Sequence, residues 1–166
     1  MKNILKIAVI TTVITLVACS SPEAEAIVDY HDGYIKNVSD KVEEIDTINE
    51  KSLTSATYEQ AYAIQKEELL PIINAIKEYM HSNEPEDESV TKYHNLRLKQ
   101  VNTWIEGFEI QLDALEKLTA EEIFESELNE LIAGAQTKIS ESFELAAQAE
   151  AELESLVSEY NLEVIE

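Results

Sequence analysis

The chain has 166 residues, with 34 acidic against 12 basic side chains and a formal charge of −22. This balance argues against nucleic acid as a partner, because phosphate binding needs a basic footprint that is absent here. Cys19 is the single cysteine, which excludes a disulfide within the chain and a cysteine metal site in its body.

The first nineteen residues carry the clearest pattern in the sequence. Lys2 and Lys6 precede a run of twelve mostly apolar residues, from Ile7 to Ala18. A basic start followed by a short apolar run is typical of a secretory signal peptide. A stable transmembrane helix needs roughly 20 apolar residues, so a permanent span is the weaker alternative. We therefore expect residues 1–18 to be a cleaved signal peptide.

The apolar run ends in Leu16-Val17-Ala18-Cys19. These four residues resemble the lipobox of bacterial lipoproteins. The resemblance implies that Cys19 receives a diacylglyceryl group, that a peptidase cuts just before it, and that the new amino group can be acylated, for example with palmitate. An unmodified cysteine behind a conventional signal is the alternative. The expected location is the extracytoplasmic face of the cell membrane, or the outer membrane, which Ser20 after the cysteine would permit.

Cleavage would leave 148 residues with ten basic and 34 acidic side chains, a formal charge of −24. An anionic membrane surface repels such a body, so only the lipid on Cys19 would hold it there. Residues 19–26 contain Pro22 among small and polar side chains, and we expect them to form a lipidated cysteine and a tether. Residues 27–166 are long enough for one compact domain.

Apolar side chains recur every three or four positions through the rest of the chain, which predicts amphipathic helices. The expected helices span about 24–50, 55–81, 89–118 and 120–160, the second with a kink near Glu67 to Pro71. Thr119 and Glu122 fit a capping box at the start of the last helix, and Gly134 is its weak point. No segment shows the alternation of polar and apolar residues that is typical of a β-strand. The predicted fold is an all-α antiparallel bundle of about four helices, the last one long, and the alternative is three helices with an oligomeric coiled coil.

Histidines and carboxylates offer few candidates for chemistry. Glu78 and His81 have the Glu-x-x-His spacing of half a di-iron site, but no second pair completes it. His94 is expected to be partly buried and hydrogen-bonded. His31 and Asp32 could form an orienting pair, yet no nucleophile motif accompanies them. We therefore expect no catalytic residue, no cofactor and no metal ligand, with metal binding by Glu78 and His81 left open.

Two classes of function remain after these exclusions. The first is a non-enzymatic binding or scaffold module, anchored to the membrane through Cys19, that meets an envelope protein or a cell-wall component. The alternative is a carrier of a metal or small ligand within the helical bundle. Glutamates crowd the outer face of the last predicted helix, and they either are solvated or attract a basic partner. The partner's identity and the oligomeric state stay open.

Overall fold

The computed structural model describes residues 13–15 and 21–165 of the chain. Cys19 and the rest of the predicted lipobox lie outside these described residues, so lipidation stays a prediction. Within the described part, short turns join six α-helices: α1 (Pro22–Asn37), α2 (Val42–Leu53), α3 (Tyr58–Ile64), α4 (Leu70–Ser82), α5 (Glu88–Thr119) and α6 (Glu125–Glu159). A 3₁₀ turn, η1 (Ser39–Lys41), separates α1 from α2, and a π-helical turn, η2 (Gln65–Leu69), separates α3 from α4.

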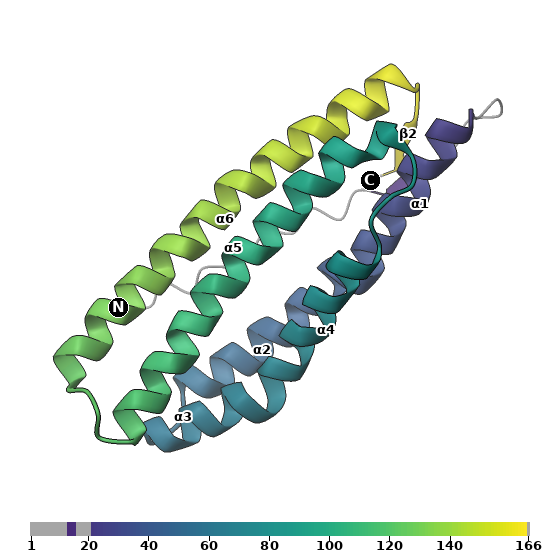
Figure 1. The fold of residues 1–166 in the computed structure, drawn as a ribbon. Coiled ribbons are helices and arrows are strands. Elements are labelled where there is room, and N and C mark those ends of the chain that lie inside the picture. The colour runs from purple at the N-terminus through teal and green to yellow at the C-terminus, as the bar shows by residue number, and fades with distance from the viewer. Residues whose placement is uncertain (1–12, 16–20, 166) are drawn as a thin grey trace.

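The helices form an elongated bundle of four antiparallel rods (Figure 1). Helices α1 and α2 follow one another in the first rod, α3 and α4 in the second, while α5 and α6 are each a rod of their own. Helices α1, α3 and α4 all contact α5, and α6 lies along most of α5. The expected all-α bundle with a long last helix is confirmed. The three-helix alternative is wrong, because both N-terminal rods pack within the same bundle.

Helix α1 begins earlier than the sequence analysis expected. Ser21 is its N-cap, and the Ser21 hydroxyl accepts a hydrogen bond of 3.3 Å from the Ala24 N–H. Pro22 then occupies the first helical position, where its missing N–H leaves no bond unmade. Ala24 is already buried. The predicted tether is therefore wrong from Pro22 onward, and the helix begins three residues after Cys19.

The first rod is not the continuous helix that was expected over 24–50. Val38 leaves the helical conformation at φ −121° and ψ −62°, and η1 restarts the chain before α2. Just before this break, Gly33 faces α4. A Cβ at that position would meet the Tyr79 hydroxyl oxygen at 2.5 Å. Glycine at position 33 therefore lets the first two rods approach closely.

The kink was expected near Glu67 to Pro71, and the chain has the π-helical turn η2 at this position. In a π-helical turn each backbone N–H bonds to the carbonyl five residues back, one further than in an α-helix. The helical hydrogen bonds are therefore rearranged at this position rather than lost. Pro71 lies in the first turn of α4, where proline needs no hydrogen-bond acceptor. The chain thus accommodates proline at a boundary between two helical segments.

Helix α6 starts later than the expected capping box at Thr119. The Thr119 hydroxyl donates to the Glu116 carbonyl oxygen at 2.8 Å, which prolongs α5, and Glu121 has a positive φ of 59° in the turn. The N-cap is Phe124, whose N–H donates to Glu127 Oε2 at 2.9 Å. Only the glutamate half of a capping box is present. Helix α6 passes through Gly134 without interruption.

Three apolar clusters fill the bundle from end to end, and α5 contributes to each. The central cluster joins α1, α2, α4 and α5 around Ile45, Ile73 and Ile105. A second cluster joins α1, α5 and α6 near the start of α1. A third, smaller cluster joins α3, α5 and α6 at the opposite end, where Leu115 packs with Leu128. The core is therefore continuous along α5.

A short two-stranded ribbon accompanies the helical bundle. Strand β1 (Val13–Thr15) pairs antiparallel with β2 (Glu163–Ile165), with Ile14 opposite Val164. Strand β1 lies within the predicted signal peptide, so cleavage there would remove the partner of β2. Among the described residues, we find no helix that combines the length and the apolar character needed to cross a membrane.

Candidate functional site

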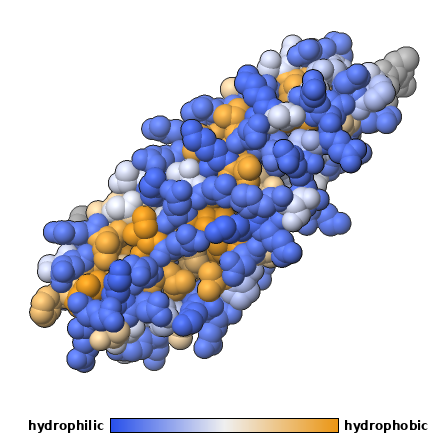
Figure 2. Space-filling view, viewed as in Figure 1, coloured by the Kyte–Doolittle hydropathy of each residue, from blue (hydrophilic) through white to orange (hydrophobic). Residues whose placement is uncertain are grey.

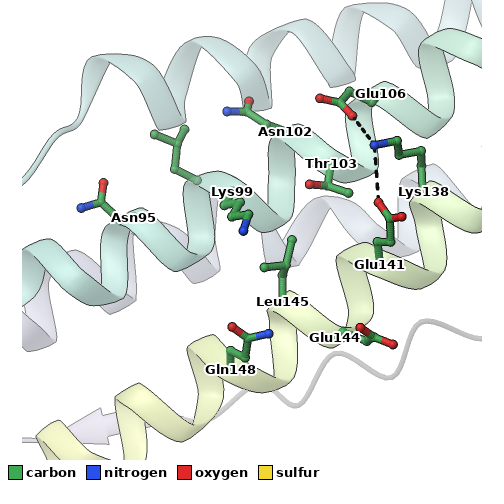
Figure 3. A pocket seen from close by; sticks show the side chains of 11 residues that line it. Asn95, Lys99, Asn102, Thr103, Glu106, Lys138, Glu141, Glu144, Leu145 and Gln148 are labelled. Carbon is green, nitrogen blue, oxygen red and sulfur yellow. Dashed lines mark ion pairs between the residues drawn. The ribbon is translucent and has the colours of Figure 1, made fainter.

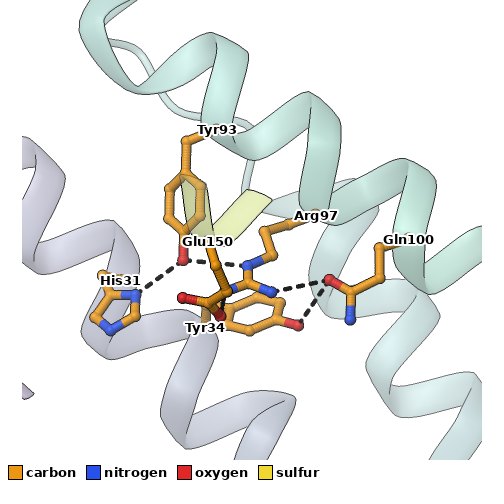
Figure 4. Close-up of polar contacts among 6 residues, drawn as sticks. All are labelled: His31, Tyr34, Tyr93, Arg97, Gln100 and Glu150. Carbon is orange, nitrogen blue, oxygen red and sulfur yellow. Dashed lines mark hydrogen bonds and ion pairs between the residues drawn. The ribbon is translucent and has the colours of Figure 1, made fainter. Parts of the chain in front are cut away.

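A buried polar network joins α1, α5 and α6 in the middle of the apolar core (Figure 4). Arg97 of α5 is its centre, with a side chain only 4% exposed. The Arg97 Nε donates to the Tyr93 hydroxyl at 3.1 Å, and Nη1 donates to Gln100 Oε1 at 3.0 Å. Nη2 forms an ion pair with Glu150 of α6. The three nitrogens of the guanidinium group therefore each have a partner.

Two tyrosine rings complete the surroundings of the Arg97 guanidinium. Its central carbon lies 4.5 Å from the ring centre of Tyr34 and 5.2 Å from that of Tyr93, distances that favour a cation–π interaction. Burial on its own would lower the pKa of Arg97. The neighbouring Tyr34, Tyr93 and Glu150 outweigh burial and raise this pKa, so the guanidinium stays charged.

The Tyr93 hydroxyl links Arg97 to a buried histidine. It lies 2.9 Å from His31 Nδ1 on α1. Because Arg97 Nε can only donate, the Tyr93 oxygen accepts from it, whereas the direction of the hydrogen bond between Tyr93 and His31 depends on the tautomer of the imidazole. Burial raises the pKa of Tyr93, so the phenol remains protonated at neutral pH. A protonated tyrosine with these two partners is suited to holding α1 against α5 rather than to transferring protons.

A second pair of a histidine and a tyrosine, His94 and Tyr30, lies beside this network. His94 Nδ1 is 3.0 Å from the Tyr30 hydroxyl, and the two rings meet edge to face. The sequence predicted a partly buried, hydrogen-bonded His94; the hydrogen bond is present, and the side chain is fully buried. Burial is the main cause of its lowered pKa, which favours the neutral imidazole. The contact between His94 and Tyr30 joins α5 to α1.

The other candidates from the sequence are not brought together. Glu78 and His81 are both exposed near the end of α4. In the part of the chain that the structure describes, no three histidine, cysteine, aspartate or glutamate side chains are grouped so that they could hold a metal ion. His31 points into the network, whereas its sequence neighbour Asp32 is exposed. The suggested orienting pair of His31 and Asp32 is therefore not formed.

A polar groove of about 620 Å³ runs between α5 and α6 on the outside of the bundle (Figure 3). Lys138 spans it, with Nζ 3.0 Å from Glu106 Oε2 and 3.4 Å from Glu141 Oε2. Both ion pairs are solvent-exposed and contribute little to stability. The groove is lined by charged and polar side chains of α5 and α6.

Among the residues that the structure describes, large apolar side chains are exposed at one end of the bundle only. Leu53, Tyr58 and Phe124, which we call the distal tip, flank the α2–α3 and α5–α6 turns, and Leu53 and Phe124 are 77% and 79% exposed. The Tyr58 hydroxyl donates to Glu125 Oε1 at 2.7 Å, which ties the two turns together. Figure 2 shows a mostly hydrophilic face on which apolar groups gather toward this end. Among the described residues, the distal tip is thus the surface most suited to binding.

No protein-family model, curated protein or solved structure matches the chain. Its function therefore has to be argued from its own residues.

Proposed function

We propose that the protein is a lipid-anchored, non-enzymatic binding module of the cell envelope that presents the distal tip to a protein partner. The lipobox supports the anchor at Cys19. The start of α1 at Pro22 supports a bundle held close to the bilayer by one end. The fully bonded network around Arg97 supports a structural rather than a catalytic use of its buried polar groups.

The observation that carries this proposal is the position of the exposed apolar groups. The distal tip lies at the end of the bundle opposite the start of α1 (Figure 1). Helix α6 has 35 residues and is therefore about 50 Å long. A membrane anchor at Cys19 would place the tip about that far from the lipid, and the acidic body would be repelled by anionic headgroups. The apolar side chains would then face a partner rather than the membrane.

The anchor is tested by mass spectrometry of the native N-terminal peptide. Acylated Cys19 as the first residue supports the proposal, and an unmodified Cys19 or cleavage elsewhere contradicts it. Cys19→Ser should release the protein from the membrane or block its processing.

The recognition surface is tested by placing a photo-crosslinking residue at single positions in intact cells. We expect Phe124 and Leu53 to give the same crosslinked product. A crosslinker at Glu86, which is exposed in the α4–α5 turn near the anchored end, is the matched control and should not give it. Equal products from Glu86 and Phe124, or none from the distal tip, would contradict a recognition role for this end.

A further inference from the structure

A cavity of about 640 Å³ continues the apolar surface of the distal tip inward, between the α2–α3 turn and helices α3, α5 and α6. Leu53 and Tyr58 of the distal tip are part of its wall. The less exposed Leu115, Leu128 and Ile132 line it from α5 and α6, and polar side chains complete the wall. A volume of this size is in the range of pockets that hold small organic groups. The distal tip and the cavity therefore form one continuous surface.

Carboxylates border this surface on both turns. Glu59 is itself part of the cavity wall. Glu121 and Glu122 are exposed in the α5–α6 turn, and Glu125 is exposed at the start of α6. Among the described residues, none of these four carboxylates forms an ion pair with a basic side chain. The apolar surface is thus bordered by negative charge that lacks a direct counterion.

The lysines that lie nearest in the sequence are bound to other acids. Lys51 forms its ion pair with Glu68, and Lys117 Nζ lies 2.7 Å from Asp113 Oδ2. Glu122 acts on Lys117 more weakly than Asp113 does. Negative charge at this end repels a second copy of this acidic chain and an anionic membrane, whereas it attracts a basic partner.

The backbone at the distal tip favours a partner that is helical. Helices and turns alone make up this end of the described chain, and strand β2 lies at the other end of the bundle (Figure 1). Without a strand edge to pair with, an extended peptide would place unpaired N–H and C=O groups against apolar side chains, which costs free energy. A helix satisfies these groups internally and can present an apolar stripe to the surface.

We propose that the partner segment is a basic amphipathic helix, which seats apolar side chains on the distal tip and in the cavity and places lysines or arginines against the bordering carboxylates. This inference rests on the proposed recognition role of the distal tip and adds the chemistry of the partner. Burial of the apolar side chains would supply most of the affinity. The exposed ion pairs would add less each and would increase the association rate.

The test uses the full chain in nanodiscs of zwitterionic lipid and three model peptides. The first peptide is an amphipathic helix of leucine and lysine, the second has the same composition in an order that abolishes the apolar stripe, and the third has glutamate in place of every lysine. Methyl NMR shifts of Leu53, Leu128 and Ile132 report occupancy of the surface. We expect only the first peptide to saturate these shifts, with an affinity that falls as sodium chloride is added. Leu145, in the polar groove, should not shift.

Two double variants separate local charge from net charge. Glu121→Gln with Glu122→Gln removes two carboxylates beside the distal tip, and the affinity for the first peptide should fall about three- to tenfold, as for two exposed ion pairs. Glu154→Gln with Glu159→Gln removes the same charge from exposed positions at the other end of α6 and should change the affinity much less. Each variant is compared with the wild type in the same lipid, so adsorption of the peptide to the nanodisc cancels.

Three results with the peptides would overturn the inference. If the second or the third peptide binds as tightly as the first, the surface does not select a basic amphipathic helix. If the two double variants weaken binding equally, only the net charge of the chain acts. If the first peptide binds without shifting the methyl groups of Leu53 and Ile132, the distal tip is not its site.

The photo-crosslink at Phe124 in intact cells separates this inference from the proposed function. Sequencing of the crosslinked partner segment by mass spectrometry should show lysines or arginines beside an apolar stripe of helical spacing. An acidic segment, or a second copy of this chain, would keep the recognition role and overturn the basic helix. Absence of any crosslinked product would contradict the recognition role itself.

Discussion

The ion pair between Arg97 and Glu150 makes a prediction in which the two single variants differ. Glu150→Leu leaves the charged guanidinium group of Arg97 inside the bundle without its counterion, since the Arg97 side chain is only 4% exposed. Arg97→Met leaves the carboxylate of Glu150, which is 36% exposed and can be solvated. We therefore expect Glu150→Leu to be the more destabilising change, although Arg97 makes more of the hydrogen bonds.

The expected costs follow from what each variant leaves behind. A buried ion that loses its counterion costs about 3–5 kcal/mol. Arg97 would keep two neutral acceptors and two ring faces, so we expect the lower end, about 3 kcal/mol, for Glu150→Leu. Arg97→Met keeps much of the packing and loses hydrogen bonds, which amounts to about 1–2 kcal/mol. The double variant removes both charges and should cost about 1 kcal/mol, less than Glu150→Leu alone.

The measurement is the free energy of unfolding in urea at neutral pH, followed by circular dichroism. Glu154→Leu, at an exposed position one helical turn further along α6, is the control for replacing a glutamate by leucine. Equal or greater destabilisation by Arg97→Met would refute the reasoning. So would a double variant whose cost is the sum of the two single costs.

Four further predictions concern α5, α6 and the charge of the chain. In Gly107→Ala, the new Cβ would lie 3.0 Å from the Ala135 carbonyl oxygen, so urea unfolding should show a loss of about 1–3 kcal/mol. Gly134→Ala meets no atom within 4 Å and should instead gain about 0.5–1 kcal/mol. The pKa of His94 is lowered in the folded state, so as the pH falls the unfolded chain protonates His94 at a higher pH than the folded chain does. Stability from neutral His94 is complete above its ordinary pKa of 6.5 and declines as the pH falls toward the folded-state value, so His94→Gln should flatten the stability profile below neutral pH. The excess of acidic side chains predicts a melting temperature that rises with sodium chloride, and a flat or falling one would contradict this.

The helices could be predicted because apolar spacing depends only on local sequence. The start of α1 was missed, although Ser21 and Pro22 together form a recognised start signal, because the small polar composition was given more weight. The prediction of a capping box at Thr119 was wrong, because the Thr119 hydroxyl donates instead to the carbonyl oxygen of Glu116, one turn back. Sequence patterns show which bonds a helix end can make, whereas the tertiary contacts decide which it does make.

The buried network was not predicted, since its partners are far apart in the chain: His31, Tyr93 and Glu150 lie on three helices. One signal was present. Arg97 is the only arginine in the sequence, and it lies four residues before Val101 on the apolar stripe of α5. An arginine on the apolar face of a helix that packs into the core predicts a buried acidic partner and further hydrogen-bond acceptors around it.

Helix α5 takes part in all three apolar clusters, and this has a consequence for amide hydrogen exchange. Any other rod can open locally while α5 stays covered by the remaining two, so amides in the middle of α5 should exchange only through global unfolding. Amides of the α2–α3 turn, which has few buried neighbours, should exchange through small local openings. Occupation of the distal tip would then slow exchange in that turn and leave α5 unchanged, which separates local ordering from a general gain in stability.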